Sequence, residues 1–390
     1  MTRWPRVTLL ILTGVVAAFG VGKVPVALPL LRDELRLSGL AAGALVAAIS
    51  GLGALAGTLF GVLADRIGHR RALAAGLVTI ALAGAAGGFA RGAAGLLAAR
   101  VVEGIGFLAV IVAVPPLIVA SSAPRDRRLA LGLWSCYVPV GSAVVLFAAP
   151  ALVALGGWRA VWFACAAVAA LLAAACAALA APRAPAPDRA PVGEEIRALG
   201  RARNALVLAI GFGGYTATYL ALVGFLPTML VAGGAALGTA ATASALVVLA
   251  NGAGNIAGGI AVRWLPRWSV MVVAAAVMGL GAALLYARGL PLPGRYAAAF
   301  VAALGGGTIP AAVMASVPLY APAPRLLAGT QGLVVQGSSL GQVAGPLLVG
   351  ALGVTRGGLA GSVLMLLCTA VCAAAGLVLR RAERVARAEG

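Results

Sequence analysis

Long apolar runs alternate with short charged, Pro-rich or Gly-rich breaks along this chain. A helix needs about 20 apolar residues to cross the hydrocarbon core of a bilayer. Runs of that length lie near residues 7–31, 40–64, 72–90, 95–121, 129–154, 160–181, 204–231, 239–262, 269–287, 295–320, 327–352 and 359–379. They do not alternate with period two and are about twice as long as a barrel strand, so a transmembrane β-barrel is excluded. The pattern predicts an all-α membrane protein with twelve transmembrane helices.

One long polar segment, from Pro182 to Arg203, divides these runs into six and six. It opens with a Pro/Ala stretch and continues with mixed acidic and basic residues, which predicts an irregular start followed by a short interfacial helix. We therefore expect an N-terminal six-helix bundle over residues 1–181 and a cytoplasmic connector over 182–203. A C-terminal six-helix bundle with a short basic tail follows over 204–390.

The two halves resemble each other in sequence. Pro124–Arg125 recurs 200 residues later as Pro324–Arg325, and Leu28–Pro29 near the end of the first run recurs as Leu226–Pro227 in the seventh. Each match joins corresponding positions of the two halves, so the two bundles should be pseudo-symmetric. Repeated six-helix halves are typical of secondary transporters, whose substrate site lies between the halves near the membrane midplane.

Composition excludes a water-soluble protein. Hydrophobic residues make up 62% of the chain and charged residues 10%, with a mean hydropathy of +1.06. An average soluble domain has about 25% charged residues. The apolar run that starts at Val7 continues to Leu31 without a persuasive cleavage site, so we interpret it as the first span rather than a signal peptide.

The net charge of +19 reflects membrane topology. With the N-terminus in the cytoplasm, 20 arginines fall in cytoplasmic segments and seven on the opposite side. This asymmetry follows the positive-inside rule. It predicts a multi-pass protein of a bacterial-type inner (plasma) membrane with both termini cytoplasmic, and it argues against nucleic-acid binding.

No residues in the chain form a cofactor or catalytic motif. The five cysteines lie in apolar runs without the spacing of a zinc site or of a disulfide framework. There is no nucleotide motif and no catalytic constellation, so we expect neither a metal, nor a cofactor, nor enzymatic activity. The expected partners are the lipid bilayer, a small-molecule substrate and protons, and the expected state is a monomer.

Two motifs resemble those of the major facilitator superfamily. The loop after the second run reads Gly61-Val62-Leu63-Ala64-Asp65-Arg66-Ile67-Gly68-His69-Arg70-Arg71, and the fourth run contains Arg100-Val101-Val102-Glu103-Gly104-Ile105-Gly106. Both occur at the helices where the family has them. The resemblance implies alternating access, with a conformational latch formed by Gly61, Asp65, Arg66, Gly68, Arg70 and Arg71.

The chain also departs from the family pattern. In the second half Val262 stands where the latch would have an acid, so a symmetric second latch is not expected. The fifth run lacks the Gly-Pro pair of the antiporter signature. The residues around Lys23, and Gly157 to Arg159 after the fifth run, look similar to the cyanate and nitroimidazole transporter-like branch.

Three ionisable residues lie well inside predicted spans: Lys23, Arg100 and Glu103. Such groups are costly in a bilayer and usually face a cavity or a partner. Lys23, the only lysine of the chain, is predicted either to neutralise an anionic substrate in a central cavity or to form an ion pair or reach the outer surface. Arg100 and Glu103 are three residues apart and therefore share a helix face. They are predicted to form either a structural ion pair or a proton relay.

Aromatic and amide residues in the spans are weaker candidates for substrate contact, with interhelical hydrogen bonds or packing as the alternative. They are Trp134, Tyr137, Tyr215, Tyr219, Asn251, Asn255, Gln331 and Gln336. The tenth run contains Gly305–Gly307 followed by Pro310, which predicts a broken segment that could act as a gating hinge.

Together these observations predict a secondary active transporter of a small, anionic organic solute that works by alternating access with proton coupling or exchange. One alternative is a proton-coupled multidrug or metabolite efflux antiporter, which would not depend on Lys23. A second alternative is a non-transporting membrane receptor with a transporter-like fold.

Overall fold

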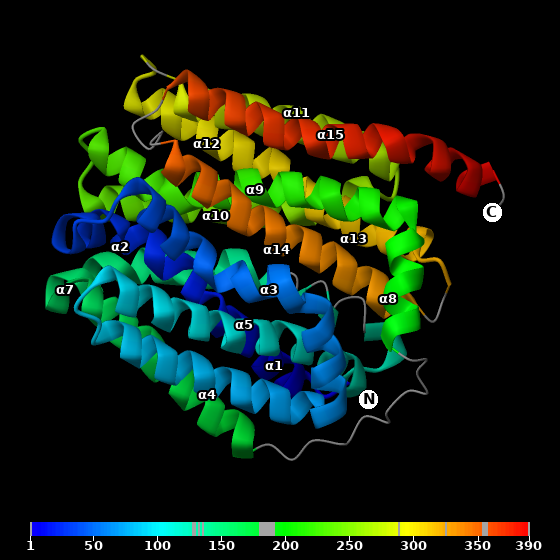
Figure 1. Ribbon diagram of the computed structural model, residues 1–390, viewed down its shortest axis with the longest axis horizontal. Helices are drawn as coiled ribbons and strands as arrows, with labels where there is room; N and C mark the ends of the chain where they lie inside the picture. The colour runs from blue at the N-terminus through cyan, green and yellow to red at the C-terminus, as the bar shows by residue number, and fades with distance from the viewer. Residues whose placement is uncertain are drawn as a thin grey trace.

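The computed structural model describes residues 2–126, 130–131, 133–134, 136–178, 192–287, 289–323, 326–352 and 358–388 (Figure 1). Regular structure in these residues is helical. The N-terminal half contains α1 (Trp4–Ala17), α2 (Phe19–Leu35), α3 (Gly39–Ile67), α4 (His69–Gly88), α5 (Ala93–Ser121), the 3₁₀ turn η1 (Pro124–Asp126) and α7 (Tyr137–Ala178). The remainder contains α8 (Val192–Arg201), α9 (Arg203–Ala232), α10 (Leu237–Ala261), α11 (Arg267–Tyr286), α12 (Leu292–Gly306), α13 (Thr308–Tyr320), α14 (Leu327–Ala351) and α15 (Leu359–Ala388).

Eleven stretches of the described residues are long and apolar enough to cross a membrane. One of them, Tyr137–Cys176, holds the fifth and sixth predicted spans. The chain turns between these two spans at Gly156 and Gly157, whose backbone angles are not helical. The eleven stretches therefore contain the twelve predicted membrane segments, and the all-α membrane fold is confirmed.

Two spans are interrupted. The tenth run divides into α12 and α13 at Gly307, within the glycine cluster where the sequence predicts a break. The first run, predicted from the sequence to be one uninterrupted helix, divides into α1 and α2 at Ala18. Of the helices that follow the two breaks, α2 carries Lys23 and α13 carries Met314, whose contacts are described below.

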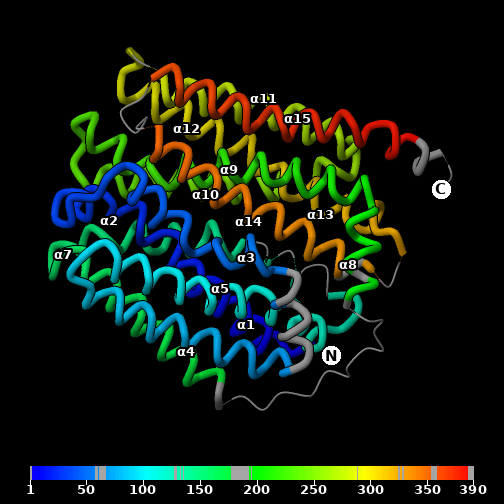
Figure 2. The backbone as a smooth tube through the Cα atoms, viewed as in Figure 1, coloured from blue at the N-terminus to red at the C-terminus, as the bar shows by residue number. Residues whose placement is uncertain are grey.

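The long helices run side by side in a single bundle, and both chain ends lie at the same end of it (Figures 1 and 2). The connector helix α8 lies at this end too. It is the short helix predicted for the connector, although residues 179–191 fall outside the described part of the chain. Leu199 anchors α8, because its buried side chain packs on Gly329 of α14 while most of the helix is exposed.

Local chemistry explains where α3 begins and ends. Ser38 caps its first turn by accepting a hydrogen bond from the amide of Ala41 at 3.1 Å. Gly68 ends the helix with a φ of 89°, a conformation that favours glycine, and joins α3 to α4 through a single residue. The glycine of the latch motif is thus required by the tight turn.

Helices α3 and α14 form the closest contact between the two halves. Gly39 and Gly43 of α3 face the backbone carbonyls of Gly350 and Pro346, so close that a Cβ atom on either glycine would clash. Small residues permit this approach of two helix backbones in a membrane.

The contact between α3 and α14 is here called the seam between the halves. Polar contacts continue this seam toward the middle of the two helices. Ser50 donates to the amide oxygen of Gln342 at 2.6 Å. Gln336 donates to the carbonyl of Ala54 at 3.0 Å, two residues before a kink at Ala56. Gln336 of the C-terminal half thus donates a hydrogen bond to a backbone carbonyl beside the kink in α3 of the N-terminal half.

The seam predicts opposite effects for two glycine substitutions in the same helix. Gly43→Ala should push α3 from α14 and lower stability by about 1–3 kcal/mol, because its methyl group overlaps the Pro346 carbonyl. Gly51→Ala meets no atom within 4 Å, and losing a helix glycine gains about 0.5–1 kcal/mol. The midpoint of thermal unfolding in detergent should be higher for Gly51→Ala than for the parent, and lower for Gly43→Ala than for the parent. Equal midpoints for the two variants would contradict this description of the seam.

Candidate functional site

Three ionisable side chains from α2 and α5 meet inside the N-terminal half. The ammonium of Lys23 lies 2.6 Å from Oε1 of Glu103. The guanidinium of Arg100 lies 2.6 Å from Oε2 of the same carboxylate, and its second terminal nitrogen donates to the carbonyl of Gly20 at 2.9 Å. Glu103 therefore bridges two cations, and the three side chains, here called the buried charge cluster, tie α2 to α5.

The packing around the buried charge cluster excludes water. Lys23 has no exposed surface, and Arg100 and Glu103 are almost as completely buried. The Lys23 ammonium lies 4.9 Å from the centroid of the Trp162 ring, a cation–π contact from α7. Gly20 makes room for the cluster, because a Cβ atom there would lie 3.1 Å from Glu103 Oε1.

The charges in this cluster do not cancel. Two cations and one carboxylate leave a net charge of +1, and Nε of Arg100 is buried with no hydrogen-bond partner among the described residues. A buried charge without compensation is costly in a low-dielectric interior. The cluster is therefore suited to attract an anion.

The structure bears on both interpretations of Lys23. The ammonium is ion-paired and points into the packed interior, where Trp162 and Gly84 surround it. A substrate anion that contacts Lys23 would have to displace the carboxylate of Glu103. The direct role in substrate neutralisation stays a prediction, as does the proton relay through Glu103. The Arg100–Glu103 pairing suggested by their spacing is present.

The candidate aromatic residues of the N-terminal half form one stack. Trp134 and Tyr137 are parallel with their ring centroids 4.5 Å apart, and Phe107 of α5 lies 6.5 Å from Tyr137. Gly14 of α1 lies against the Trp134 ring. These residues pack α1, α5 and the start of α7 together, and no observation assigns them a ligand.

A second stack lies in the C-terminal half. Phe212, Tyr215 and Tyr219 of α9 are stacked in sequence with centroids 5.6 and 5.9 Å apart. Asn251 of α10 donates to the Tyr215 hydroxyl at 3.1 Å and to the carbonyl of Ala303 at 3.1 Å. The arrangement joins α9, α10 and α12 and buries both tyrosines.

The remaining amide candidates occupy three separate places. Asn255 is partly buried on α10, one turn after Asn251. Gln331 donates to the sulfur of Met314 at 3.0 Å and thereby links α14 to α13. Gln336 contacts Ala54 in the seam between the halves. The candidate substrate residues are therefore divided among several contacts rather than gathered in one.

The latch motif is described only in part. The side-chain surroundings of Gly61, Asp65 and Arg66 fall outside the described residues, so their predicted roles stay predictions. Gly68 forms the turn between α3 and α4, and Arg70 and Arg71 are exposed at the start of α4.

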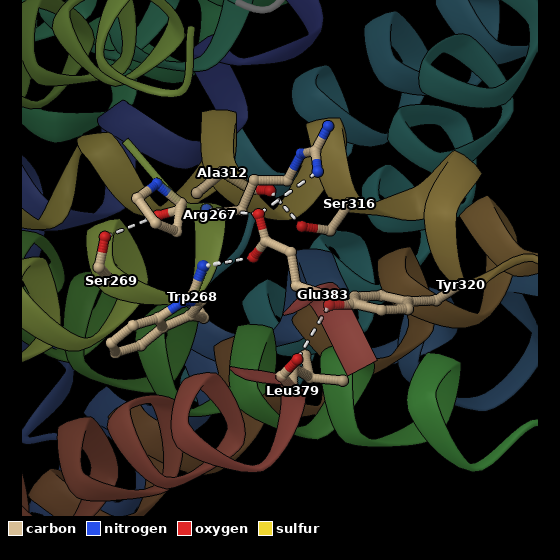
Figure 3. Close-up of polar contacts among 9 residues, drawn as sticks. Arg267, Trp268, Ser269, Ala312, Ser316, Tyr320, Leu379 and Glu383 are labelled. Atoms are coloured by element: carbon tan, nitrogen blue, oxygen red, sulfur yellow. Dashed lines mark hydrogen bonds and ion pairs between the residues drawn. The ribbon is translucent and has the colours of Figure 1, made fainter. Parts of the chain in front are cut away.

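A polar cluster at the start of α11 was not predicted from the sequence (Figure 3). Glu383 of α15 is buried and accepts hydrogen bonds from the backbone amides of Arg267 and Trp268 at 3.0 and 3.1 Å. The Arg267 guanidinium lies 3.5 Å from the same carboxylate. A carboxylate is favourable at a helix N-terminus, and Pro266, which precedes α11, has no side-chain acceptor. Glu383 supplies this acceptor, although it lies 116 positions after Arg267 in the chain.

A third ionic contact, also missed, ties the far end of α2 to α7. Glu34 accepts hydrogen bonds from the Trp158 indole and the Arg159 guanidinium, both at 2.7 Å. Arg159 also lies over the Trp158 ring, 4.3 Å from its centroid. The Gly-Trp-Arg sequence after the fifth run was the only local sign of this contact. Its partner, Glu34, lies 124 residues before Trp158 in the chain.

The fold and these contacts can be compared with known proteins. A model of the Major Facilitator Superfamily matches residues 10–292. The chain belongs to the major facilitator superfamily. The family and the fold are those of secondary transporters, so the chain is a multi-pass membrane protein with a transporter fold, as the sequence predicts.

Solved structures of several transporters are similar in fold. A bacterial homolog of the human lysosomal transporter Spinster, in an inward-facing and occupied conformation, has a TM-score of 0.80 and 18% identity over 98% of this chain and 97% of that chain. A D-xylose-proton symporter has a TM-score of 0.77 and 13% identity, covering 95% of this chain and 97% of that chain. The nucleoside transporter NupG has a TM-score of 0.75 and 13% identity, covering 97% of this chain and 99% of that chain. The cyanate and nitroimidazole branch is not among these likenesses and stays a prediction.

The buried charge cluster predicts a ranking of two variants. Glu103→Gln leaves Lys23 and Arg100 buried side by side without their shared carboxylate. Breaking a buried ion pair in this way costs about 3–5 kcal/mol. Lys23→Met leaves the neutral Arg100–Glu103 pair and should be much better tolerated. Thermal unfolding of both purified variants checks the ranking, and a Glu103→Gln variant as stable as Lys23→Met would show that the charges are balanced elsewhere.

Proposed function

We propose that this chain transports a small organic anion by alternating access, coupled to proton movement or to exchange for a second solute. The observation that carries the proposal is that one carboxylate, Glu103, bridges the basic side chains of Lys23 and Arg100 inside packed protein, which gives the three groups a formal charge of +1. Ionisable groups held inside a membrane protein usually mark ion and substrate pathways.

An anion can balance this formal charge. Lysine offers a compact charge on a flexible stem, whereas the planar arginine fork pairs with a carboxylate in a fixed geometry. Lys23 is the cation whose removal leaves the paired Arg100 and Glu103 with no net formal charge. A bound anion would therefore replace Glu103 as the partner of Lys23, while Arg100 keeps its contact with the carboxylate.

The position of the cluster connects it to the moving parts of the fold. Lys23 is the fifth residue of α2, the helix that follows the break at Ala18. The same helix packs further along with α9 of the other half, where Val24, Leu28 and Leu31 belong to one apolar core with Leu222 to Leu230. A change in the pairing of Lys23 would act on a helix that contacts both halves.

The membrane context and the latch complete the proposal. The arginine asymmetry supports an inner (plasma) membrane location with both termini cytoplasmic. The motif from Gly61 to Arg71 would bias the equilibrium between inward-open and outward-open states, as the family resemblance implies.

Solute flux into proteoliposomes tests the function. Small carboxylates and inorganic anions should enter when a pH gradient or an internal counter-solute is supplied. Lys23→Gln should reduce the rate at least tenfold, because the formal charge of the cluster then falls from +1 to zero. Arg91→Gln removes a cation from an exposed turn and serves as the matched control with unchanged flux.

Other outcomes identify the alternatives. Transport of hydrophobic cations or neutral compounds with equal rates in the parent and Lys23→Gln would overturn the anion proposal in favour of efflux. Absence of flux for every solute, with correctly inserted protein, would favour a receptor.

A further inference from the structure

A basic and aromatic surface surrounds the start of α11. The loop from α10 into α11 reads Arg263-Trp264-Leu265-Pro266-Arg267-Trp268, and the end of α15 carries Arg380, Arg381 and Arg384. The two segments are in contact, because Arg380 lies 4.8 Å from the Trp268 ring centroid and Glu383 bonds to Arg267 and Trp268. We call these residues the α11/α15 basic surface.

The surface lies at the boundary of the membrane-spanning segments. The candidate spans on either side of the loop end at Ala261 and begin at Arg267, and the span in α15 ends at Arg384. Figure 1 shows the end of α15 projecting beyond its neighbours at the side where both termini lie. Residues here meet lipid headgroups rather than acyl chains.

Its positive charge is not cancelled by the nearby acid. Glu383 is 1% exposed, and its carboxylate is directed to the α11 amides and Arg267 (Figure 3). Arg263 in the loop and Arg380, Arg381 and Arg384 of α15 are exposed. The carboxylate of Glu383 therefore pairs with Arg267 beneath the surface, and these four arginines remain on the outside.

The aromatic residues complete a lipid-binding arrangement. The face of the Arg380 guanidinium stacks on the Trp268 ring, which fixes its orientation. The N–H donors lie along the edge of the guanidinium, where two of them can bind a phosphate together. Trp264 is 82% exposed and Leu265 51%. An exposed tryptophan beside arginines is suited to a membrane interface and would gain nothing from a free inorganic ion.

We propose that the α11/α15 basic surface binds the headgroup of an anionic phospholipid in the adjoining leaflet. The phosphate would lie among Arg380, Arg384 and Arg263, and the indole of Trp264 would insert between the glycerol region and the upper acyl chains. Clusters of arginine at the end of a membrane helix attract anionic lipids in this way. The site is separate from the buried charge cluster and does not depend on the identity of the substrate.

Binding to the full-length, delipidated protein in neutral detergent tests the proposal. The probes are phosphatidylglycerol, phosphatidylcholine with the same acyl chains, and inorganic phosphate, measured by native mass spectrometry. Phosphatidylglycerol should be retained over phosphatidylcholine. Arg380→Gln/Arg384→Gln should weaken its binding about 30-fold, the loss expected for two arginines at a charged surface.

The control distinguishes lipid binding at the α11/α15 basic surface from a general effect of basic charge. Arg197→Gln/Arg201→Gln removes the same two charges from the exposed face of α8, at the same end of the molecule. This variant should bind phosphatidylglycerol as the parent does. Trp268→Leu keeps every charge and removes the stacking partner of Arg380, so it should also weaken binding.

Three results would overturn the proposal. They are equal losses in the α8 and α15 variants, full competition by inorganic phosphate, and unchanged binding in the α15 variant. Because the readout is lipid retention, these results are independent of any transport assay.

Discussion

An ionised side chain inside a membrane helix bundle must have a partner of opposite charge, and this constraint organises the N-terminal half. Lys23, Arg100 and Glu103 meet this demand only partly, because one carboxylate serves two cations. The surrounding packing is adapted to the cluster: Gly20 leaves room for the carboxylate and Trp162 presents its ring to the ammonium. A single arrangement thus ties α2 to α5 and retains one positive charge in the protein interior.

The contact between the halves follows a different physical rule. Along α3 and α14 the backbones approach so closely that side chains are excluded at Gly39 and Gly43, and polar side chains join the helices further along at Ser50 and Gln342. Backbone contact of this kind depends on dispersion and on a few hydrogen bonds rather than on the hydrophobic effect, which is weak between helices in lipid. Under the proposed alternating access, such surfaces would separate and rejoin during a transport cycle.

How much of this could be predicted from the sequence depends on the range of each interaction. The apolar runs predict the spans, and Gly307 lies in the predicted break, because both depend on local composition. The Arg100–Glu103 contact follows from helix spacing. The partner of Lys23 lies 80 residues away and that of Arg267 lies 116 residues away, so neither contact leaves a local signal. The break at Ala18 also has no proline or glycine at the residue itself.

The central claim is that the buried charge cluster, with two basic side chains on one carboxylate, attracts an anion through Lys23. Anion binding to the purified protein, measured by isothermal titration calorimetry, tests this claim directly. A transported anion should bind to the parent protein and should bind at least tenfold more weakly to Lys23→Met, which retains the Arg100–Glu103 pair. Equal affinity of the two proteins for the anion would contradict the account.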